Sequence, residues 1–361
     1  MHLKQINLPL ALRIIATTLL LLTFGLIMIY SASVSEALRD FGTKWYFVNL
    51  QLKWSLVGLA GMLIASRIPI KFIEKLAPLA LFVGLALLVA VLIPGLGTKV
   101  YGARRWIATP IFNIQPSELI KLIEIIYLSS WLSKKKVTLP QFLGFIGVFS
   151  GLIMLQPDMG TTIVVTLIAC AMYFLAGYPI KHLLLLGGIG IGLAVVLIAI
   201  EPYRLARVTT LFNPESDPQG SSYHIRQVLL ALGSGGATGV GIGRSRQKYE
   251  YLPESTTDSI FAVVGEELGF IGAIALIISF CYFIYQFFKI GRESRSHYGS
   301  LLATGIGCWI GLQVLLNLSA MVALAPLTGI PLPLVSYGGS SLVTMLLGIG
   351  LAISVAREER L

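Results

Sequence analysis

The feature that most constrains this chain is a series of long apolar runs that fill most of its 361 residues. A helix needs about 20 predominantly apolar residues to cross a bilayer, and lipid leaves helices and closed barrels as the only spanning structures. No alternating pattern indicates a barrel. The glycine-rich stretch 227–243 is expected to form a re-entrant or surface segment. We therefore expect an all-α membrane protein with ten transmembrane helices, near residues 14–33, 48–66, 76–94, 111–132, 140–156, 160–177, 183–200, 259–288, 299–323 and 337–356.

The composition leads to the same fold class. Hydrophobic residues make up 56% of the chain and charged residues only 12%, which excludes a water-soluble fold. The first apolar run is longer than the core of a cleavable signal peptide and lacks a convincing cleavage site, so we expect it to remain as a helix. No linker, repeat or second soluble domain is visible. Residues 1–361 are expected to form a single membrane domain.

The charged residues indicate the orientation and exclude one class of partner. The formal charge is +10, but the basic residues form short clusters between apolar runs, so nucleic acid is not expected. Anionic lipid headgroups or a phosphate-bearing substrate fit better. Cytoplasmic amino and carboxyl termini satisfy the positive-inside rule, with segments 95–110 and 201–258 outside. The inner basic residues are then Arg67, Lys71, Lys75, Lys134 to Lys136, Lys181, Lys289, Arg292 and Arg295.

Cysteine and histidine give no sign of a metal centre or a disulfide framework. Their positions match no paired ligand spacing, and the cysteines lie inside apolar runs, where they are interpreted as packing residues. They are Cys170, Cys281, Cys308, His2, His182, His224 and His297.

The first outer segment leads into a helix that carries charges inside the membrane. Arg104 and Arg105 precede Pro116, which suits a helix start, and Glu118 and Lys121 follow three residues apart on one helical face. Intramembrane charges are costly and usually face a polar cavity. A functional pair is favoured over the alternative, a structural ion pair between helices.

The long outer segment ends in a second group of polar residues. Lys248 lies among cations suited to phosphate oxygens, and Asp258 lies where the chain re-enters the membrane. A partly desolvated carboxylate there can act as a general base, although capping of the eighth helix is an equal alternative. Asp158 lies in the turn before the sixth helix, where capping of that helix and a role in the site are equal alternatives. Glu266 and Glu267, about two turns deeper, are expected to join a structural ion network, with Asp258 or Lys121 as possible neighbours.

The last two spans also carry polar residues. Gln313 and Asn317, four residues apart, give the ninth span one inward polar stripe. Small polar residues from Ser336 to Ser341 open the tenth span, and hydroxyl and backbone donors at a helix start can receive an anion. Ser340 is the substrate-binding candidate in this run, with helix packing as the alternative use of small residues.

Five segments carry a resemblance to a known family. They are GARRW (102–106), QPSELIK (115–121), QPDMGTT (156–162), YLPESTTDSIFAVVGEELG (251–269) and PLTGIPLPLVSYGGSSL (326–342). In this order and spacing they resemble the SEDS family of bacterial shape, elongation, division and sporulation proteins, over nearly the whole chain. The resemblance implies a ten-helix peptidoglycan glycosyltransferase that polymerises lipid II at the outer face of the bacterial cytoplasmic membrane. Segment 243–255 is more similar to the division members than to the elongation members, which implies septal wall synthesis.

The resemblance also assigns roles to residues. The family's catalytic aspartate falls on Asp258, its membrane-embedded acid and lysine on Glu118 and Lys121, and its first outer-loop cations on Arg104 and Arg105. Thr256 stands where a histidine is expected, which favours Asp258 as the base. The implied partners are lipid II, membrane lipids, a class B penicillin-binding transpeptidase, and other division or elongation proteins.

The chemistry implied is one inverting displacement, in which Asp258 takes the proton of the acceptor hydroxyl and cations stabilise the departing pyrophosphate. A divalent cation, Mg²⁺ or Mn²⁺, is an open option, and no other cofactor is indicated. Two rival functions use the same residues differently. A flippase for lipid II favours charges at the membrane midplane, whereas these motifs gather at one face. A scaffold that only recruits a partner does not require Glu118 or Lys121 inside the membrane.

Overall fold

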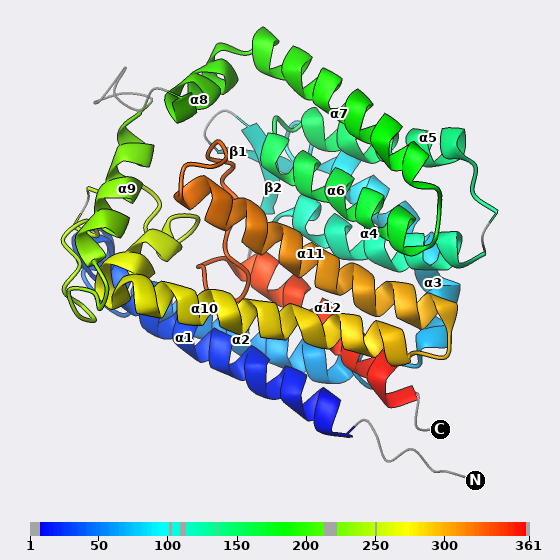
Figure 1. Ribbon diagram of the computed structural model, residues 1–361, viewed down its shortest axis with the longest axis horizontal. Helices are drawn as coiled ribbons and strands as arrows, with labels where there is room; N and C mark the ends of the chain where they lie inside the picture. The colour runs from blue at the N-terminus through cyan, green and yellow to red at the C-terminus, as the bar shows by residue number, and fades with distance from the viewer. Residues whose placement is uncertain are drawn as a thin grey trace.

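The computed structural model describes residues 8–100, 103–108, 113–134, 136–212, 222–249 and 251–358. Its long helices run back and forth across one bundle, and the amino end of the first helix lies at the same end as the carboxyl end of the last helix (Figure 1). The ten expected spans correspond to α1 (Leu8–Phe41), α2 (Tyr46–Ala65), α3 (Ile70–Ala90), α4 (Pro116–Ser133), α5 (Leu139–Met154), α6 (Met159–Leu175), α7 (Ile180–Ile200), α10 (Ile260–Glu293), α11 (His297–Met321) and α12 (Gly339–Glu358).

Length and composition make this a multi-pass membrane protein. Among the described residues, seven of these helices are long and apolar enough to cross a membrane, and α5 and α6 are shorter apolar helices. The remaining one, α4, carries Glu118, Lys121 and Glu124 within 18 residues. Because these three residues are spaced three apart, one face of α4 is charged, and most of its other residues are apolar. The predicted fold class is therefore confirmed.

The end of the bundle opposite the amino end of α1 carries elements that the sequence did not predict. Between α3 and α4, β1 (Gly97–Val100), β2 (Ala103–Ala108) and β3 (Asn113–Ile114) form an antiparallel sheet in the order β1-β2-β3. Between α7 and α10, the segment expected to be a loop contains α8 (Pro202–Phe212) and α9 (Tyr223–Gly235). The stretch 227–243 is thus helical up to Gly235, and its remaining glycines form turns.

A break in α10 fixes the position of its outer end. Gly269 has φ 67°, and the backbone N–H groups of Phe270 and Ile271 donate to the carbonyls of Gly236 (2.9 Å) and Ala237 (3.1 Å). Such a conformation favours glycine, and helix kinks arise where the i to i−4 ladder is interrupted. The turn after α9 therefore satisfies the broken ladder and attaches the outer segment to α10.

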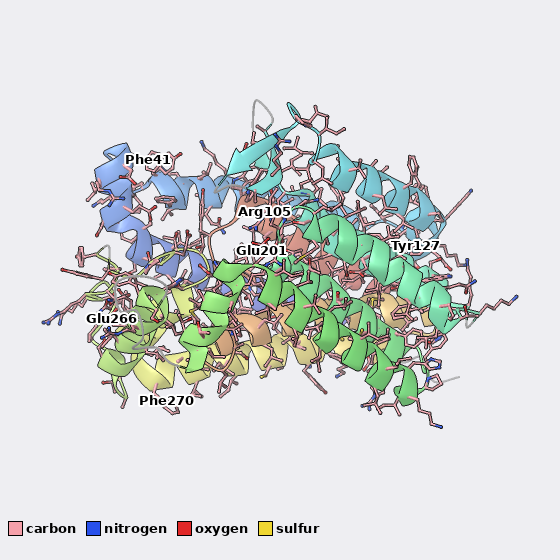
Figure 2. The ribbon with its side chains drawn as sticks, turned by 90° about the horizontal axis from the view of Figure 1, so that it is seen from above. Phe41, Arg105, Tyr127, Glu201, Glu266 and Phe270 are labelled. Carbon is pink, nitrogen blue, oxygen red and sulfur yellow. The ribbon has the colours of Figure 1, made fainter. Side chains whose placement is uncertain are left out.

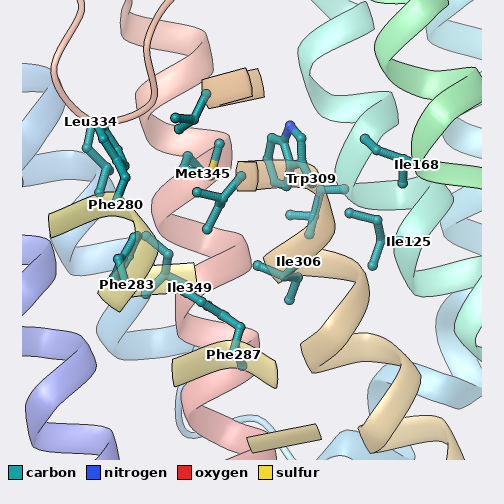
Figure 3. Close-up of a cluster of buried hydrophobic side chains, with 14 of the residues drawn as sticks. Ile125, Ile168, Phe280, Phe283, Phe287, Ile306, Trp309, Leu334, Met345 and Ile349 are labelled. Atoms are coloured by element: carbon teal, nitrogen blue, oxygen red, sulfur yellow. The ribbon is translucent and has the colours of Figure 1, made fainter. Parts of the chain in front are cut away.

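The core of the bundle is formed by α11 and α12. Trp309 and Ile306 of α11 lie against Met345 and Ile349 of α12, with the phenylalanines of α10 beside them (Figure 3). These side chains are almost fully buried, and in a membrane such close packing, rather than water exclusion, holds helices together. The amino ends of α10 and α12 and the carboxyl end of α11 are thereby held in fixed positions around one cavity.

Candidate active site

A cavity of about 1570 Å³ opens at the end of the bundle that carries the three-stranded sheet, α8 and α9. Its walls come from α2, β2, α4, α6, α8, α9 and the segments that precede α10 and α12. Viewed from above, Arg105 and Glu201 lie near the centre of the molecule, in the region of this cavity (Figure 2). The titratable side chains among its described lining residues include Arg105, Glu118, Lys121, Asp158, Glu201, Arg204, Arg207, His224, Glu254 and Asp258.

Asp258 lies in the wall of this cavity, two residues before α10. Its side chain is 8% exposed and accepts a hydrogen bond from Thr257 Oγ1 at 3.2 Å. Its backbone carbonyl accepts a hydrogen bond from Asn317 Nδ2 at 2.8 Å, so the polar stripe of α11 holds this residue in place. The N-cap residue of α10 is Ser259. The capping alternative for Asp258 therefore loses its geometric basis.

The surroundings of Asp258 change its acidity. Burial raises the pKa of the Asp258 carboxyl to about 6, and the negative charge of Glu254 adds to this shift. The carboxyl is therefore mostly ionised at neutral pH, and its pKa lies near the pH at which a general base is most effective.

Glu118 and Lys121 form the ion pair that the sequence predicted. Lys121 Nζ lies 2.7 Å from Glu118 Oε1, both side chains are buried, and both line the cavity. Lys121 Nζ also lies 5.8 Å from the ring centroid of Trp309. In the described part of the chain, the second carboxylate oxygen of Glu118 has no hydrogen-bond partner. A buried acceptor of this kind normally has a partner, so an ordered water or a ligand would complete its hydrogen bonding.

Only one of the two neighbouring arginines faces the cavity. Successive side chains of a strand point to opposite faces, and both arginines lie on β2. Arg105 lines the cavity and donates to the backbone carbonyls of Gln156 (3.1 Å) and Pro157. Arg104 donates to the carbonyl of Leu92 at 3.5 Å and lies outside the set of described lining residues.

The structure places the other two predicted binding residues, Ser340 and Lys248, in different parts of the molecule. Ser340 lines the cavity at the start of α12, and its hydroxyl donates to the Asn113 carbonyl at 2.9 Å. Lys248 is buried elsewhere, with its Nζ 2.9 Å from Glu267 Oε1 and 3.0 Å from Ser31 Oγ. The predicted ion network of the paired glutamates is present. However, Lys248 is the ammonium partner of Glu267, where the sequence suggested Lys121 or Asp258 as neighbours.

The second glutamate of this network holds the loop backbone. Glu266 accepts hydrogen bonds from the Ser245 hydroxyl and from the backbone N–H groups of Arg246 (2.8 Å) and Gln247 (3.4 Å). The network thus attaches segment 245–248 to α10.

Two cavity cations were missed by the sequence reasoning. Arg204 and Arg207 come from α8, and their spacing of three residues in an amphipathic segment is the signal that could have found them. An Arg207 guanidinium nitrogen donates to the Leu327 carbonyl at 2.9 Å, and one from Arg204 donates to the Leu197 carbonyl at 3.0 Å. These contacts fix α8 against the segment before α12 and the end of α7.

A histidine next to the aspartate was also missed. His224 Nε2 lies 2.7 Å from Ser259 Oγ, the hydroxyl of the residue after Asp258. Burial and the charge of Arg207 lower the pKa of His224 to about 4, so the ring is neutral at neutral pH. Asp158 lines the cavity as well, but its carboxylate also caps α6 by accepting from Thr161 N at 3.0 Å.

The cavity thus combines an anion-binding set with one carboxyl of raised pKa. Arg105, Lys121, Arg204 and Arg207 supply cationic donors of the kind that bind phosphate oxygens. Within the described ranges, no group of three or more His, Cys, Asp or Glu side chains could hold a metal ion. A Mg²⁺ ion that enters with phosphates needs only one or two carboxylates, and Glu254 and Asp258 could supply these.

Comparisons with known proteins identify relatives along the full length of the chain. A sequence profile of the FtsW/RodA/SpoVE family, described as cell cycle protein, matches residues 11–361. Stage V sporulation protein E of Bacillus subtilis is 42% identical, with 96% of this chain and 97% of the relative covered. The probable peptidoglycan glycosyltransferase FtsW of Nitrosomonas europaea is 37% identical, with 100% and 96% covered.

Solved structures share the fold. One solved structure concerns the structural coordination of polymerization and crosslinking by a peptidoglycan synthase complex. A chain of that structure aligns with a TM-score of 0.78 at 26% identity, over 96% of this chain and 97% of that one. The rod shape determining protein RodA of Thermus thermophilus aligns with a TM-score of 0.70 at 26% identity, over 96% of both chains. The chain therefore belongs to the FtsW/RodA/SpoVE family of cell cycle proteins, the SEDS family that its motifs resemble.

Proposed function

We propose that this chain is a peptidoglycan glycosyltransferase that polymerises lipid II into β-1,4-linked glycan strands, in the division branch of its family. The observation that supports this proposal most is Asp258, a buried carboxyl of raised pKa in the wall of a cavity that also contains four cations. The names of relatives such as the FtsW of Nitrosomonas europaea support the same activity.

The reaction is a single inverting displacement. The 4-hydroxyl oxygen of the acceptor sugar attacks the anomeric carbon of the donor, and the bond from that carbon to the pyrophosphate oxygen breaks. Asp258 accepts the hydroxyl proton as the new bond forms. The α-linked donor thus yields a β-linked product without a covalent intermediate on the protein. Asn317, which binds the Asp258 backbone, is a positioning residue.

The cations of the cavity stabilise the departing pyrophosphate. Arg105 and Lys121 approach from β2 and α4, and Arg204 and Arg207 from α8. Donors that are already fixed by the fold need little reorganisation when the leaving group develops charge. Arg105 and Arg207 are fixed in this way by the carbonyls that they contact. Glu118 keeps the Lys121 ammonium at the cavity wall.

Orientation and partners follow from the same proposal. The cavity faces the outside of the cytoplasmic membrane, and both termini face the cytoplasm, in agreement with the basic inner segments. A class B penicillin-binding transpeptidase binds this chain and cross-links the new strands, as expected from the similarity to a chain of a peptidoglycan synthase complex. Orientation is tested with a membrane-impermeant thiol reagent, which should label Tyr251→Cys but not Lys136→Cys in intact cells.

One experiment separates the polymerase from its rivals. The purified chain, with its cognate transpeptidase, is supplied with fluorescent lipid II in detergent, and glycan strands are resolved on a gel. A polymerase yields a ladder of strands that lysozyme digests. In liposomes, transfer of labelled lipid II between leaflets without strand formation would identify a flippase instead. A scaffold would show neither activity.

A further inference from the structure

The turn between α1 and α2 exposes a group of aromatic rings that the proposed chemistry does not use. We call Phe41, Trp45, Tyr46 and Phe47 the aromatic tip. Phe41 and Trp45 are 46% and 47% exposed, and Tyr46 is 36% exposed. Figure 2 shows Phe41 at the free end of α1, farther from the centre of the molecule than Arg105 and Glu201. Exposed rings of this number on one turn require an explanation.

The lengths of α1 and α2 place this tip at the border of the hydrocarbon core. At 1.5 Å per residue, the 34 residues of α1 extend about 50 Å, whereas the hydrocarbon core is about 30 Å thick. Counted from Arg13, the first charged residue of α1, about 20 residues reach Ser33. The helix continues for about 12 Å beyond this point. However, α2, a candidate span of 20 residues, begins at Tyr46, and Phe41 stacks on Tyr46, so the tip lies at the membrane border, level with the belt that aromatic residues commonly form.

A continuous series of ring contacts joins the tip to the catalytic cavity. Tyr337 lines the cavity, and its backbone N–H donates to the Thr256 carbonyl at 2.9 Å. Its ring meets that of Phe47 edge-on, with centroids 5.3 Å apart, and Phe47 meets Tyr46 in the same way at 5.3 Å. Phe41 stacks on Tyr46 at 3.6 Å. A polymer that leaves the cavity beside Tyr337 would therefore meet these rings in order.

The charges around the tip suit the uncharged sugar backbone of a glycan. Glu36, Arg39, Asp40 and Lys44 carry two negative and two positive charges, so the tip has no net charge. Arg39 Nε lies 2.6 Å from Asp40 Oδ1, and Lys44 Nζ lies 5.5 Å from the Trp45 ring centroid. A surface for anionic lipid would carry excess positive charge. Aromatic faces with polar neighbours instead match pyranose rings, whose C–H groups stack on aromatic rings while their hydroxyls form hydrogen bonds.

We propose that the aromatic tip, joined to the cavity through Tyr337, binds the β-1,4-linked glycan strand next to the cavity and holds it between successive additions. This proposal rests on the proposed polymerase function. It predicts that the tip determines strand length, whereas Asp258 determines the rate of each addition.

The first test measures rate and length together. In the transpeptidase complex, Trp45→Ala with Tyr46→Ala should leave the initial rate of lipid II consumption within about twofold of wild type. The mean strand length should fall about threefold to tenfold, the loss expected for two stacking rings. Phe82→Ala, which removes a lipid-facing ring that is 71% exposed on α3, is the matched control and should change neither quantity. Unchanged strand length, or an equal fall in rate and length, would overturn the proposal.

The second test measures binding without polymerisation. A soluble β-1,4-linked N-acetylglucosamine hexamer is titrated against the purified protein in a calorimeter, so that the signal does not depend on Trp45. Wild type, Phe82→Ala and Asp258→Asn should bind it, and the double tip variant should bind about threefold to tenfold more weakly. A protein that binds the hexamer through the tip but forms no glycan would refute the polymerase and leave the tip as a glycan site. Equal binding by wild type and the tip variant would overturn the tip proposal, and shorter strands would then indicate a transpeptidase contact.

Discussion

Two buried lysine–glutamate pairs in this molecule have nearly the same geometry and different surroundings. Lys121 and Glu118 are 2.7 Å apart in the wall of the outer cavity, and Lys248 and Glu267 are 2.9 Å apart behind it. Glu267 also accepts hydrogen bonds from the Ser31 hydroxyl and from Ser245 N. Glu118 keeps one carboxylate oxygen without a hydrogen-bond partner in the described part of the chain.

The difference indicates what each pair does. A buried ion pair whose remaining hydrogen-bonding groups are satisfied is compatible with a purely structural role. A pair that lines a cavity and leaves an acceptor oxygen open can interact with a ligand. We therefore assign Lys248 and Glu267 to the attachment of the outer segment to α10, and Glu118 and Lys121 to the substrate site.

The largest expected effect is on stability, at the enclosed pair. Glu267→Gln leaves the Lys248 ammonium buried without a negative partner, which should lower the free energy of unfolding by about 3 to 5 kcal/mol. Thermal unfolding of the purified protein in detergent measures this loss. Glu118→Gln is the matched control and should unfold closer to wild type, because Lys121 lines the cavity and a small movement of its side chain would bring the ammonium to water. Equal melting temperatures for both variants would remove the distinction between the pairs.

The open pair should instead affect activity. Lys121→Gln removes a cation that we propose stabilises the leaving pyrophosphate, and polymerisation should fall by about 10²-fold. Membrane insertion and transpeptidase binding should be retained. The rate of glycan formation from lipid II is the measurement. Normal polymerisation by both Lys121→Gln and Glu118→Gln would show that this pair is also structural.

A smaller effect separates the two arginines of β2. Arg105→Ala should weaken lipid II binding, seen as a rise in KM of about tenfold, because a charged hydrogen-bond donor to the substrate is lost. Arg104→Ala, on the opposite face of the same strand, should change KM by less than about twofold. Steady-state kinetics of the two variants test this alternation. Equal effects would mean that both side chains reach the substrate or that neither does.

The smallest effect is a shift in the pH profile. A general base acts in its ionised form, so activity should be lost as pH falls through the Asp258 pKa of about 6. Glu254→Gln removes a like charge that raises this pKa, so the acidic limb should move to lower pH. The pH dependence of kcat/KM measures both. A limb that stays in place in Glu254→Gln would assign the titration to another group.

The spans could be predicted from the sequence because each needs about 20 apolar residues and few alternatives exist in lipid. The i to i+3 rule was also sufficient to pair Glu118 with Lys121. The three-stranded sheet was missed because its strands have only two to six residues and lie in a segment that reads as a loop.

Which residues form the site depends on the distances between segments far apart in the sequence, and no local pattern contains these distances. Lys248 and Arg105 are both cations of outer segments, yet only Arg105 reaches the cavity, and the cause is the position of Glu267 beside Lys248. Arg207 and His224 come to the cavity through α8 and α9, whose packing depends on the whole bundle. Local sequence identified the chemical types and the ion pair within one helix, but not which residues of different segments meet.

The most direct measurement is polymerisation by Asp258→Asn in the purified transpeptidase complex. Asparagine keeps the size of the side chain but cannot accept the hydroxyl proton. The account predicts a fall in glycan formation of at least about 10²-fold, with folding and transpeptidase binding unchanged. Near wild-type strand formation by Asp258→Asn would contradict the assignment of Asp258 as the general base.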